Sequence, residues 1–406
     1  MSVLDRIAAT TSIAAIIDEG GAVDAEWLSE KLGHTVASAQ LRDQEKMGGM
    51  SGAEFRFIDV RFADEETDDV ALVLKQSAPS SKGAMMGLAR EAFFYTELSS
   101  GLVGAGVPRC YYATGDMATG ETLILAECLP DSVPAGVFFG PGNPNNWAVA
   151  ADLPALCEGN PDALEVTRKA FSLYAQLHAA HWQDATLLDG KSWVRGADWY
   201  TGQGEAGWTG AQRMASEGWA AAMEQRDAGN AEIRWDAHLV ACMQASFAAT
   251  SWDGFQSERQ TRPFALVHGD AHPHNQLWTR QRTPEARLRL IDFEMIGVGS
   301  PAQELGQYLI SHMEPELRRT HERELVGAYH AEVVAALHAR GMETEAAAFT
   351  LEACFAEYVA GGVGRWVWFI PLFWQMTPVA QFFHDQLAAF LHDHVADPAT
   401  TPMPRV

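Results

Sequence analysis

The stretch LVHGDAHPHNQLWTRQRTPEARLRLIDFE, residues 266–294, carries the most informative pattern in the chain. A short apolar run leads into HGD at 268–270, and Asn275 follows five residues after the aspartate. A polar stretch then leads to a second apolar run, 288–291, which ends in DFE at 292–294. Two β-type runs therefore deliver an aspartate, an asparagine and a second aspartate to one edge of the structure.

These residue types suit phosphoryl transfer from a nucleotide to an alcohol. Asp270 would orient the acceptor hydroxyl and accept its proton, which makes it the predicted catalytic residue. Asn275 and Asp292 offer the oxygen ligands that Mg²⁺ prefers. Glu294 falls on the same face as Asp292 by strand alternation, so we expect it at the metal or as a cap for a neighbouring element. The stretch predicts the core of a small-molecule kinase.

A second interpretation is a transition-metal hydrolase, because histidines stand at positions 268, 272 and 274. Imidazole clusters bind Zn²⁺ or Mn²⁺. However, Pro273 and the small residues around it predict an irregular loop, and a hydrolase would leave Asn275 and the later Asp-Phe-Glu without a role. We therefore favour the kinase and interpret His268 as a residue that holds the loop.

Upstream of this stretch, residues 70–75 predict a buried strand that ends in Lys75. The segment 90–98 has apolar residues at helical spacing and carries Glu91 at its start. A glutamate in that position would pair with the lysine and hold its ammonium group on the nucleotide phosphates. A solvated helix face is the alternative for Glu91, and we favour the ion pair.

Two further segments are candidates for nucleotide contacts. The glycine-rich turn GGMSG at 48–52 would let the backbone of Gly49, Ser51 and Gly52 approach phosphate oxygens. A later strand ends near Glu127, where backbone groups would receive an adenine edge. Glycine turns between strands are mostly simple hairpins, so the turn is the weaker of these signals.

The composition is that of a soluble globular enzyme, with 406 residues, 47% apolar and 20% charged. This length allows two lobes with separate cores. A net charge of −24 argues against a nucleic-acid or anionic-membrane partner and is compatible with a cationic substrate. The most apolar stretch, 363–370, is interrupted by Arg365 and is too short to span a bilayer. Five scattered cysteines and the lack of a signal-peptide pattern favour the cytoplasm.

The chain in order predicts an N-terminal lobe at 1–130 and a C-terminal lobe at 131–406. Residues 1 to about 45 are expected to be helical, with Asp24 as the N-cap of one helix, before a nucleotide-binding sheet and one key helix. The segment 134–161 is expected to be a loop or an inter-lobe connection. The remainder is expected to be mainly helical, with the catalytic loop and the acceptor site, and to end in a frayed tail at 396–406.

HGD at 268–270 through Asn275, followed by IDFE at 291–294, resembles the aminoglycoside phosphotransferase and choline kinase superfamily. The order of glycine turn, Lys75, Glu91, hinge and catalytic loop agrees, so the resemblance covers roughly residues 45–310. The segment AEWLSEKLG, residues 25–33, and the long C-terminal helices are similar to the ecdysteroid kinase-like branch in particular.

The resemblance implies an α+β, two-lobed protein-kinase-like fold with a β-rich N-lobe and a larger, mainly helical C-lobe. It implies an ATP-dependent kinase that uses Mg²⁺, with Asp270 as base, Asn275 and Asp292 as metal ligands, and Lys75 as phosphate ligand. Where the family often has an aspartate in the next helix, this chain has Glu304, the residue that would substitute for it.

The acceptor is expected to be a hydroxyl of a small molecule, because the protein-kinase sequences HRD, DFG and APE are missing from their expected places. Acidity and the many aromatic residues favour a cationic or amphipathic alcohol. The alternative function is a nucleotide-binding pseudokinase that serves as a binding or regulatory module. The presence of the full set of candidate catalytic residues argues against that alternative, and the oligomeric state is left open.

Overall fold

The computed structural model describes residues 25–42, 53–64, 66–102, 106–129, 131–159, 161–279 and 288–406. The chain forms two compact units, one of Met1–Ser132 with Thr279–Met295 and one of Val133–Trp278 with Ile296–Val406. The first holds an antiparallel sheet and the second is mainly helical, which confirms the expected α+β, two-lobed class. The lobe boundary expected near residue 130 stays a prediction. The expected N-terminal lobe ended at residue 130 and did not include residues 279–295, which belong to the first unit of the structure.

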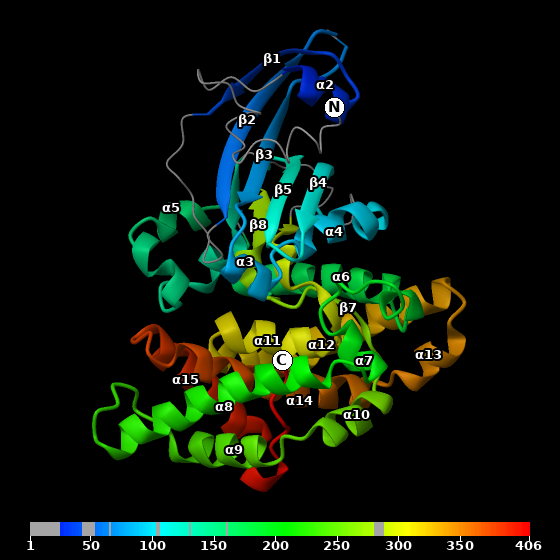
Figure 1. The fold of residues 1–406 in the computed structure, drawn as a ribbon. Helices are drawn as coiled ribbons and strands as arrows, with labels where there is room; N and C mark the ends of the chain where they lie inside the picture. Colours follow the sequence, from blue (N-terminus) through cyan, green and yellow to red (C-terminus); the bar gives the residue numbers. More distant parts are fainter. Residues whose placement is uncertain are drawn as a thin grey trace. The chain divides into compact units, whose positions relative to one another are not determined.

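Within the described residues, the sheet of the first unit has five strands in the order β1-β2-β3-β5-β4 (Figure 1). The strands are β1 (Val36–Leu41), β2 (Glu54–Phe62), β3 (Val70–Ser77), β4 (Cys110–Asp116) and β5 (Glu121–Glu127), and the helices beside them are α2 (Ala25–Leu32), α3 (Ser81–Met86) and α4 (Arg90–Glu97). Alternation along β3 turns Leu72 and Leu74 into the core shared with α2. Val73 and Lys75 therefore point to the opposite face, where Val73 packs with residues of α4.

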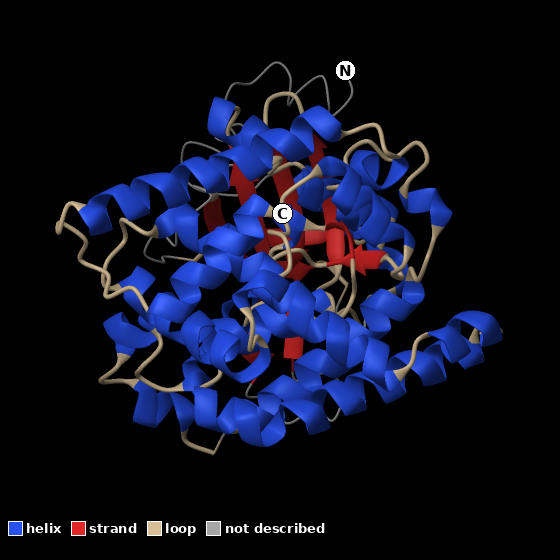
Figure 2. Cartoon of the chain, turned by 90° about the horizontal axis from the view of Figure 1, so that it is seen from below, coloured by secondary structure: helices blue, strands red, loops and turns tan. Residues whose placement is uncertain are grey.

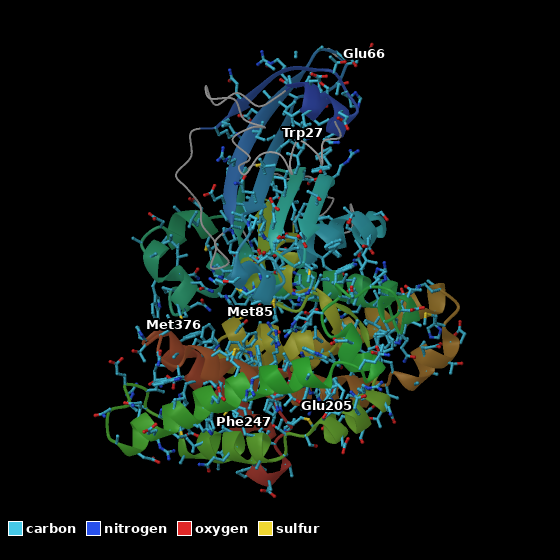
Figure 3. All side chains as sticks on the ribbon, viewed as in Figure 1. Trp27, Glu66, Met85, Glu205, Phe247 and Met376 are labelled. Atoms are coloured by element: carbon cyan, nitrogen blue, oxygen red, sulfur yellow. The ribbon has the colours of Figure 1, made fainter. Side chains whose placement is uncertain are left out.

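Residues 36–41 form β1, so the helix expected through about residue 45 is wrong for this segment. Gly33 has a φ of 73°, a left-handed conformation that ends α2, and β1 then pairs antiparallel with β2. Trp27, which is labelled in Figure 3, and Val36 are both buried in the same core. Pairing and burial of β1 outweigh the helix propensity of its alanines, glutamine and leucine. The expected N-cap, Asp24, lies outside the described residues.

Helices make up most of the second unit (Figure 2). They are α5 (Leu153–Cys157), α6 (Ala163–Ala180), α7 (Ala197–Thr201), α8 (Glu205–Asp227), α9 (Ala237–Ala248), α10 (Trp252–Gln260), α11 (Gln303–His312), α12 (Pro315–Ala339), α13 (Glu343–Ala348), α14 (Leu351–Phe373) and α15 (Val379–His394). Helix α6 packs against α12, and α11 packs against α14. Among the described helices, none has both the length and the apolar character needed to cross a membrane.

The segment 134–161 contains short helices and is not the plain loop that its glycines and prolines predicted. Two 3₁₀ helices, η3 (Ala135–Phe139) and η4 (Pro144–Val149), precede α5. The Asn143 side chain caps η4 by accepting the N–H of Asn145, and proline fits the first helical turn, where no N–H is needed. Short helices thus occupy much of the segment that was expected to be a loop or an inter-lobe connection.

The end of the chain packs against the helices of the second unit, so the frayed tail expected at 396–406 is wrong. Gln212 Nε2, from α8, donates to the carbonyl oxygen of Pro404 at 2.7 Å. The N–H of Arg405 donates to the carbonyl oxygen of Gly364, from α14, at 2.9 Å. Met403 is also buried. These backbone partners hold the segment in place.

Two glycines allow α11 and α14 to approach closely. A Cβ atom at Gly306 of α11 would lie 2.5 Å from the carbonyl oxygen of Tyr358 and 2.6 Å from the Cα of Gly362, both in α14. The clashing atoms belong to the backbone, so the helices themselves would have to move apart. The position of α11, which carries several residues of the candidate site, therefore depends on a glycine at 306.

We expect Gly306→Ala to destabilise the protein by about 1–3 kcal/mol, the usual cost of overpacking. Gly327→Ala is the matched control, because Gly327 lies in α12 and nothing within 4 Å would meet its Cβ. That change should stabilise the protein by about 0.5–1 kcal/mol through helix propensity. Denaturant unfolding of both variants measures the two changes, and equal effects would contradict the close approach.

Candidate active site

The first unit holds a buried cluster of one lysine and three carboxylates. Lys75 Nζ lies 2.5 Å from Glu91 Oε2 of α4, which is the ion pair expected from the sequence. The same ammonium lies 2.7 Å from Asp292 Oδ1 and 2.9 Å from Glu294 Oε1. Lys75, Glu91 and Glu294 are buried, whereas the Asp292 side chain is 39% exposed. One positive group thus faces three acidic ones.

Burial and charge oppose each other in this cluster. Burial alone would lower the pKa of Lys75, but the carboxylates of Glu91, Asp292 and Glu294 raise it well above its ordinary value. Burial raises the pKa of Glu91 to about 7, against the lowering effect of Lys75. The ligand oxygens of the three acids lie within 4.8 Å of one another. Their surplus of negative charge and their hard oxygen atoms fit a divalent cation such as Mg²⁺.

Asp292 and Glu294 reach Lys75 through a turn, where the sequence had suggested strand alternation. Strand β9 (Leu288–Leu290) ends before Asp292, and the 3₁₀ helix η7 (Phe293–Met295) follows it. Asp292 has a φ of 66°, a left-handed conformation that aspartate tolerates better than most residues. A turn with this conformation brings both carboxylates to one ammonium.

Contacts within the first unit hold this turn. The ring of Phe293 stacks on Phe94 of α4 with centroids 4.1 Å apart. Arg90 Nη1 donates to the carbonyl oxygen of Glu294 at 3.0 Å and to that of Met86 at 2.9 Å. The surrounding structure thus fixes an uncommon backbone conformation at a candidate metal ligand. Sequence reasoning did not single out Phe94 or Arg90.

The second unit holds the loop that carries Asp270. Strand β7 (Ala265–Val267) pairs antiparallel with β10 (Gly297–Gly299), and Gly269 follows with a φ of 82°. The carboxylate of Glu304 accepts the N–H of His268 at 3.0 Å and that of Gly269 at 2.6 Å. Glu304, in the first turn of α11, thus supports the loop as the family resemblance suggested.

Glu304 is itself held by His178 of α6. His178 Nε2 lies 2.9 Å from Glu304 Oε2, and its Nδ1 lies 2.7 Å from the hydroxyl of Tyr329. Burial would raise the pKa of Glu304, but the hydrogen bond and charge of His178, together with His268 and the N–H of Gly269, lower it. A buried carboxylate kept ionised by these donors is a strong anchor for a backbone loop.

The Asp270 carboxylate is positioned from three sides and remains partly exposed, at 34% of its side-chain area. Asn275 Nδ2 donates to its Oδ2 at 3.0 Å and to its carbonyl oxygen at 3.0 Å. Gln307 Nε2 donates to Oδ1 at 3.3 Å, and His272 Nε2 lies 3.4 Å from Oδ2. Burial opposes ionisation, but His272, His268 and Arg365 lower the pKa of Asp270 below its ordinary range.

Arg365 connects Asp270 to helix α14, a connection that sequence reasoning missed. Its Nη2 donates to the carbonyl oxygen of Gly269 at 2.8 Å, and its Nε donates to Gln307 Oε1 at 3.3 Å. Burial lowers the pKa of Arg365 to about 10, which still leaves it charged at neutral pH. The only available signal was the interruption of the apolar run 363–370 by a single arginine.

Three imidazoles gather beside Asp270, from His272, His274 and His312. Their ligand nitrogens lie within 4.8 Å of one another, and His274 Nδ1 is 2.9 Å from His312 Nε2. Burial lowers the pKa of His274 to about 4 and that of His312 well below its ordinary value. His274 and His312 are therefore neutral at neutral pH. His268, which we considered with His272 and His274, instead accepts the N–H of Asp270 on Nδ1, at 3.4 Å.

The remaining candidate residues concern the nucleotide. Gly49, Ser51 and Gly52 lie outside the described residues. Glu127 is the last residue of β5; its Oε2 accepts the N–H of Arg109 at 3.1 Å, and its own N–H donates to the carbonyl oxygen of Arg109 at 2.8 Å. The hinge function of Glu127 stays a prediction.

We expect Glu304→Gln to destabilise the protein by about 2–4 kcal/mol at neutral pH, because a buried charged partner of two backbone N–H groups is lost. The pKa of Glu304 is lowered from 4.5 on folding, so its contribution exists above that pH and disappears as the pH falls through the folded value. The melting-temperature difference between wild type and variant should therefore shrink at acidic pH. Glu352→Gln, at an exposed position of α14, is the control. A difference that does not change with pH would contradict this assignment.

Comparison with known proteins identifies one family and several solved structures. The model of the ecdysteroid kinase-like family matches residues 163–342. A GDP complex of a mutant aminoglycoside 2′-phosphotransferase-IIIa is 12% identical with a TM-score of 0.45, covering 91% of this chain and 97% of that chain. Choline kinase from Cryptosporidium parvum Iowa II is 11% identical with a TM-score of 0.42, covering 87% and 88%.

The choline kinase LicA from Streptococcus pneumoniae is 13% identical with a TM-score of 0.40, covering 90% of this chain and 98% of that chain. No curated protein matches the chain significantly. At these TM-scores the likenesses carry no argument about chemistry, which rests on the residues of this chain. The family match spans α6, the loop of Asp270 and all of α12, and it confirms the resemblance to the protein-kinase-like superfamily.

Proposed function

We propose that the protein is an ATP-dependent kinase that transfers the γ-phosphoryl group to a hydroxyl of a small molecule. The observation that carries the proposal is the buried ion pair of Lys75 with Glu91, extended by Asp292 and Glu294. An ammonium group and acidic oxygens at one place are what nucleotide phosphates and their Mg²⁺ require. A purely structural ion pair would not need a third and a fourth charged group.

Asp270 would orient the acceptor hydroxyl. Its lowered pKa keeps it ionised at neutral pH, so it accepts a hydrogen bond from the hydroxyl but is a weak base. A weak base is sufficient for phosphoryl transfer through a loose transition state, in which the proton moves late. The donors from Asn275 and Gln307 fix the direction of the carboxylate and support this role.

Lys75 would bind the phosphates while Glu91 holds its ammonium group in place. Asp292 and Glu294 would hold Mg²⁺, together with Asn275, whose amide nitrogen bonds Asp270 and whose oxygen is the atom suited to a cation. When bound, the ion neutralises phosphate charge. The backbone of Gly49, Ser51 and Gly52 and the chain near Glu127 would contact the nucleotide. Residues 1–130 would then serve the nucleotide and residues 131–406 the acceptor.

The kinase is proposed to be cytoplasmic. An active kinase and a pseudokinase with the same site residues would differ only in turnover. The similar solved structures include a choline kinase, an ethanolamine kinase and an aminoglycoside phosphotransferase, some of them in complex with GDP or AMP. Small alcohols, with Mg-ATP as donor, are accordingly the first compounds to screen for ADP release. Absence of release from all of them would favour a binding or regulatory module.

We expect Asp270→Asn to reduce acceptor-dependent ADP release by about 10²–10⁴-fold, the usual contribution of a general base. Nucleotide affinity should change little, because the proposed phosphate and metal ligands remain. Steady-state kinetics and titration of Mg-ATP measure the two quantities separately. Wild-type turnover in this variant would show that Asp270 is not the base.

In contrast to Asp270→Asn, Asp292→Ala should act mainly on nucleotide binding. Loss of a metal ligand should weaken Mg-ATP binding about tenfold or more, about 1.4 kcal/mol. The affinity for ATP without Mg²⁺ should fall less. Asp227→Ala, at an exposed position of α8, is the control. Unchanged Mg-ATP affinity in Asp292→Ala, measured by calorimetry, would refute the ligand assignment.

A further inference from the structure

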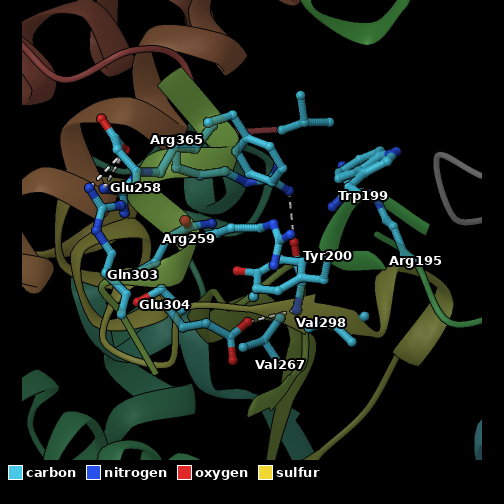
Figure 4. A pocket seen from close by; sticks show the side chains of 18 of the residues that line it. Arg195, Trp199, Tyr200, Glu258, Arg259, Val267, Val298, Gln303, Glu304 and Arg365 are labelled. Atoms are coloured by element: carbon cyan, nitrogen blue, oxygen red, sulfur yellow. Dashed lines mark hydrogen bonds and ion pairs between the residues drawn. The ribbon is translucent and has the colours of Figure 1, made fainter. Parts of the chain in front are cut away.

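A pocket in the second unit adjoins the loop of Asp270 (Figure 4). Gly269 and Gln307, the neighbours of Asp270 described above, line it, and so does Arg365. The pocket has a cavity volume of about 60 Å³ and opens to solvent. A space of that size holds a few water molecules or one small anionic group, so a larger body would extend from it toward solvent.

The side chains that line this pocket are mainly basic, in a chain whose net charge is −24. Arginines outnumber glutamates five to two, and they are Arg195, Arg259, Arg262, Arg365 and Arg405, against Glu258 and Glu304. Glu304 is occupied by the loop, and Glu258 Oε2 lies 2.7 Å from Arg262 Nη2. Glu357, beside Arg262 and Arg405, adds one further acid. The five guanidinium groups thus face three glutamate carboxylates and, through Arg365, that of Asp270, so positive charge exceeds negative charge by one among these side chains.

Three polar atoms of the pocket residues are buried without a hydrogen-bond partner among the described residues. They are Arg365 Nη1, Ser300 Oγ and Arg405 Nη2, of which Arg405 Nη2 has an ion-pair partner, Glu258 Oε2, at 3.8 Å. Arg365 is 1% exposed, Ser300 6% and Arg405 9%. A buried polar group without a partner costs about 1–3 kcal/mol, and more when it is charged. Guanidinium and hydroxyl donors of this kind are matched by an oxyanion, which guanidinium binds in a bidentate manner.

Aromatic side chains also line the pocket. Trp208 stacks on Phe255 with ring centroids 5.4 Å apart, and the Arg195 guanidinium lies 5.4 Å from the centre of the Trp199 ring. Such a wall suits an apolar or ring-shaped body rather than a bare inorganic ion. The pocket thus combines a surface for a ring with donors for an anionic group.

Arg365 connects this pocket to the candidate catalytic carboxylate. It donates to the carbonyl oxygen of Gly269 and to Gln307, which in turn donates to Asp270. We propose that the pocket binds the anionic group of the acceptor, so that the acceptor is a hydroxylated compound with a carboxylate or phosphate on an apolar body. This inference rests on the proposed kinase function, and it differs from the cationic acceptor that overall acidity favoured.

Three alcohols with the same ring and hydroxyl separate the possibilities. They are 4-(hydroxymethyl)benzoate, benzyl alcohol and 4-(aminomethyl)benzyl alcohol, which carry an anionic group, a hydrogen atom and a cationic group at the para position. A fourth compound, 4-(hydroxymethyl)phenyl phosphate, distinguishes phosphate from carboxylate. Calorimetric titration of the full chain should show that the better anionic compound binds about tenfold or more tightly than benzyl alcohol, at least about 1.4 kcal/mol, and that the amine binds most weakly.

The variants Arg259→Gln and Arg405→Gln should remove most of this preference and leave the affinity for benzyl alcohol unchanged. Arg405→Lys tests the fork geometry, because it keeps the charge and loses the paired donors. Arg213→Gln, whose side chain is 73% exposed on α8, should keep the full preference. The melting temperature of each variant shows whether it is folded, and the preference is read only from the folded ones.

Equal binding of anionic and neutral compounds, tighter binding of the amine, or no binding of either anion at about 10 mM would overturn the inference. ADP release, measured in parallel, tests the kinase proposal separately from the inference about the pocket. Anion-selective binding without any ADP release would count against the kinase and leave the pocket assignment standing. Release with the amine but not with the anions would support the kinase and overturn the assignment.

Discussion

The carboxylate of Glu304 is the interaction on which the geometry of the second unit's site depends. It accepts two consecutive backbone N–H groups, from His268 and Gly269, and so fixes the direction in which the chain presents Asp270. Because Glu304 begins α11, the loop inherits the position of that helix. The close approach of α11 and α14 at Gly306 then places Gln307 and Arg365 around the same loop. The packing of α11 against α14 therefore also determines the geometry of the loop that carries Asp270.

The cluster in the first unit follows a different physical logic. Lys75 satisfies part of the charge of Glu91, Asp292 and Glu294, while burial and the carboxylates of Asp292 and Glu294 raise the pKa of Glu91. Hydrophobic residues of similar volume would often be no less stable than a buried ion pair. A surplus of acidic oxygens that costs stability is the expected property of a site built for a cation, since perturbed pKa values gather at functional sites.

Local patterns predicted the residues whose role follows from nearby sequence. Alternation along β3 places Lys75 on the face of α4, and helical spacing places Glu91 toward it. The same reasoning failed for residues 36–41, because their strand depends on pairing with β2. It also failed at the end of the chain, where partners come from α8 and α14. Gln307 and Arg365 escaped notice because their contacts with the loop span long distances in sequence.

The overall charge of the chain and the charge of the proposed acceptor pocket predict different acceptors, for a related reason. A net charge of −24 is a sum over the whole surface, whereas a ligand senses the groups within a few ångströms of it. At the pocket beside Gly269 the local sum has the opposite sign, and burial strengthens each charge that remains there. The arginines that produce this local sum come from α10, the segment after α10, α14, the segment before α7 and the end of the chain. Only the fold brings them together, so the chemistry of the pocket is a tertiary property.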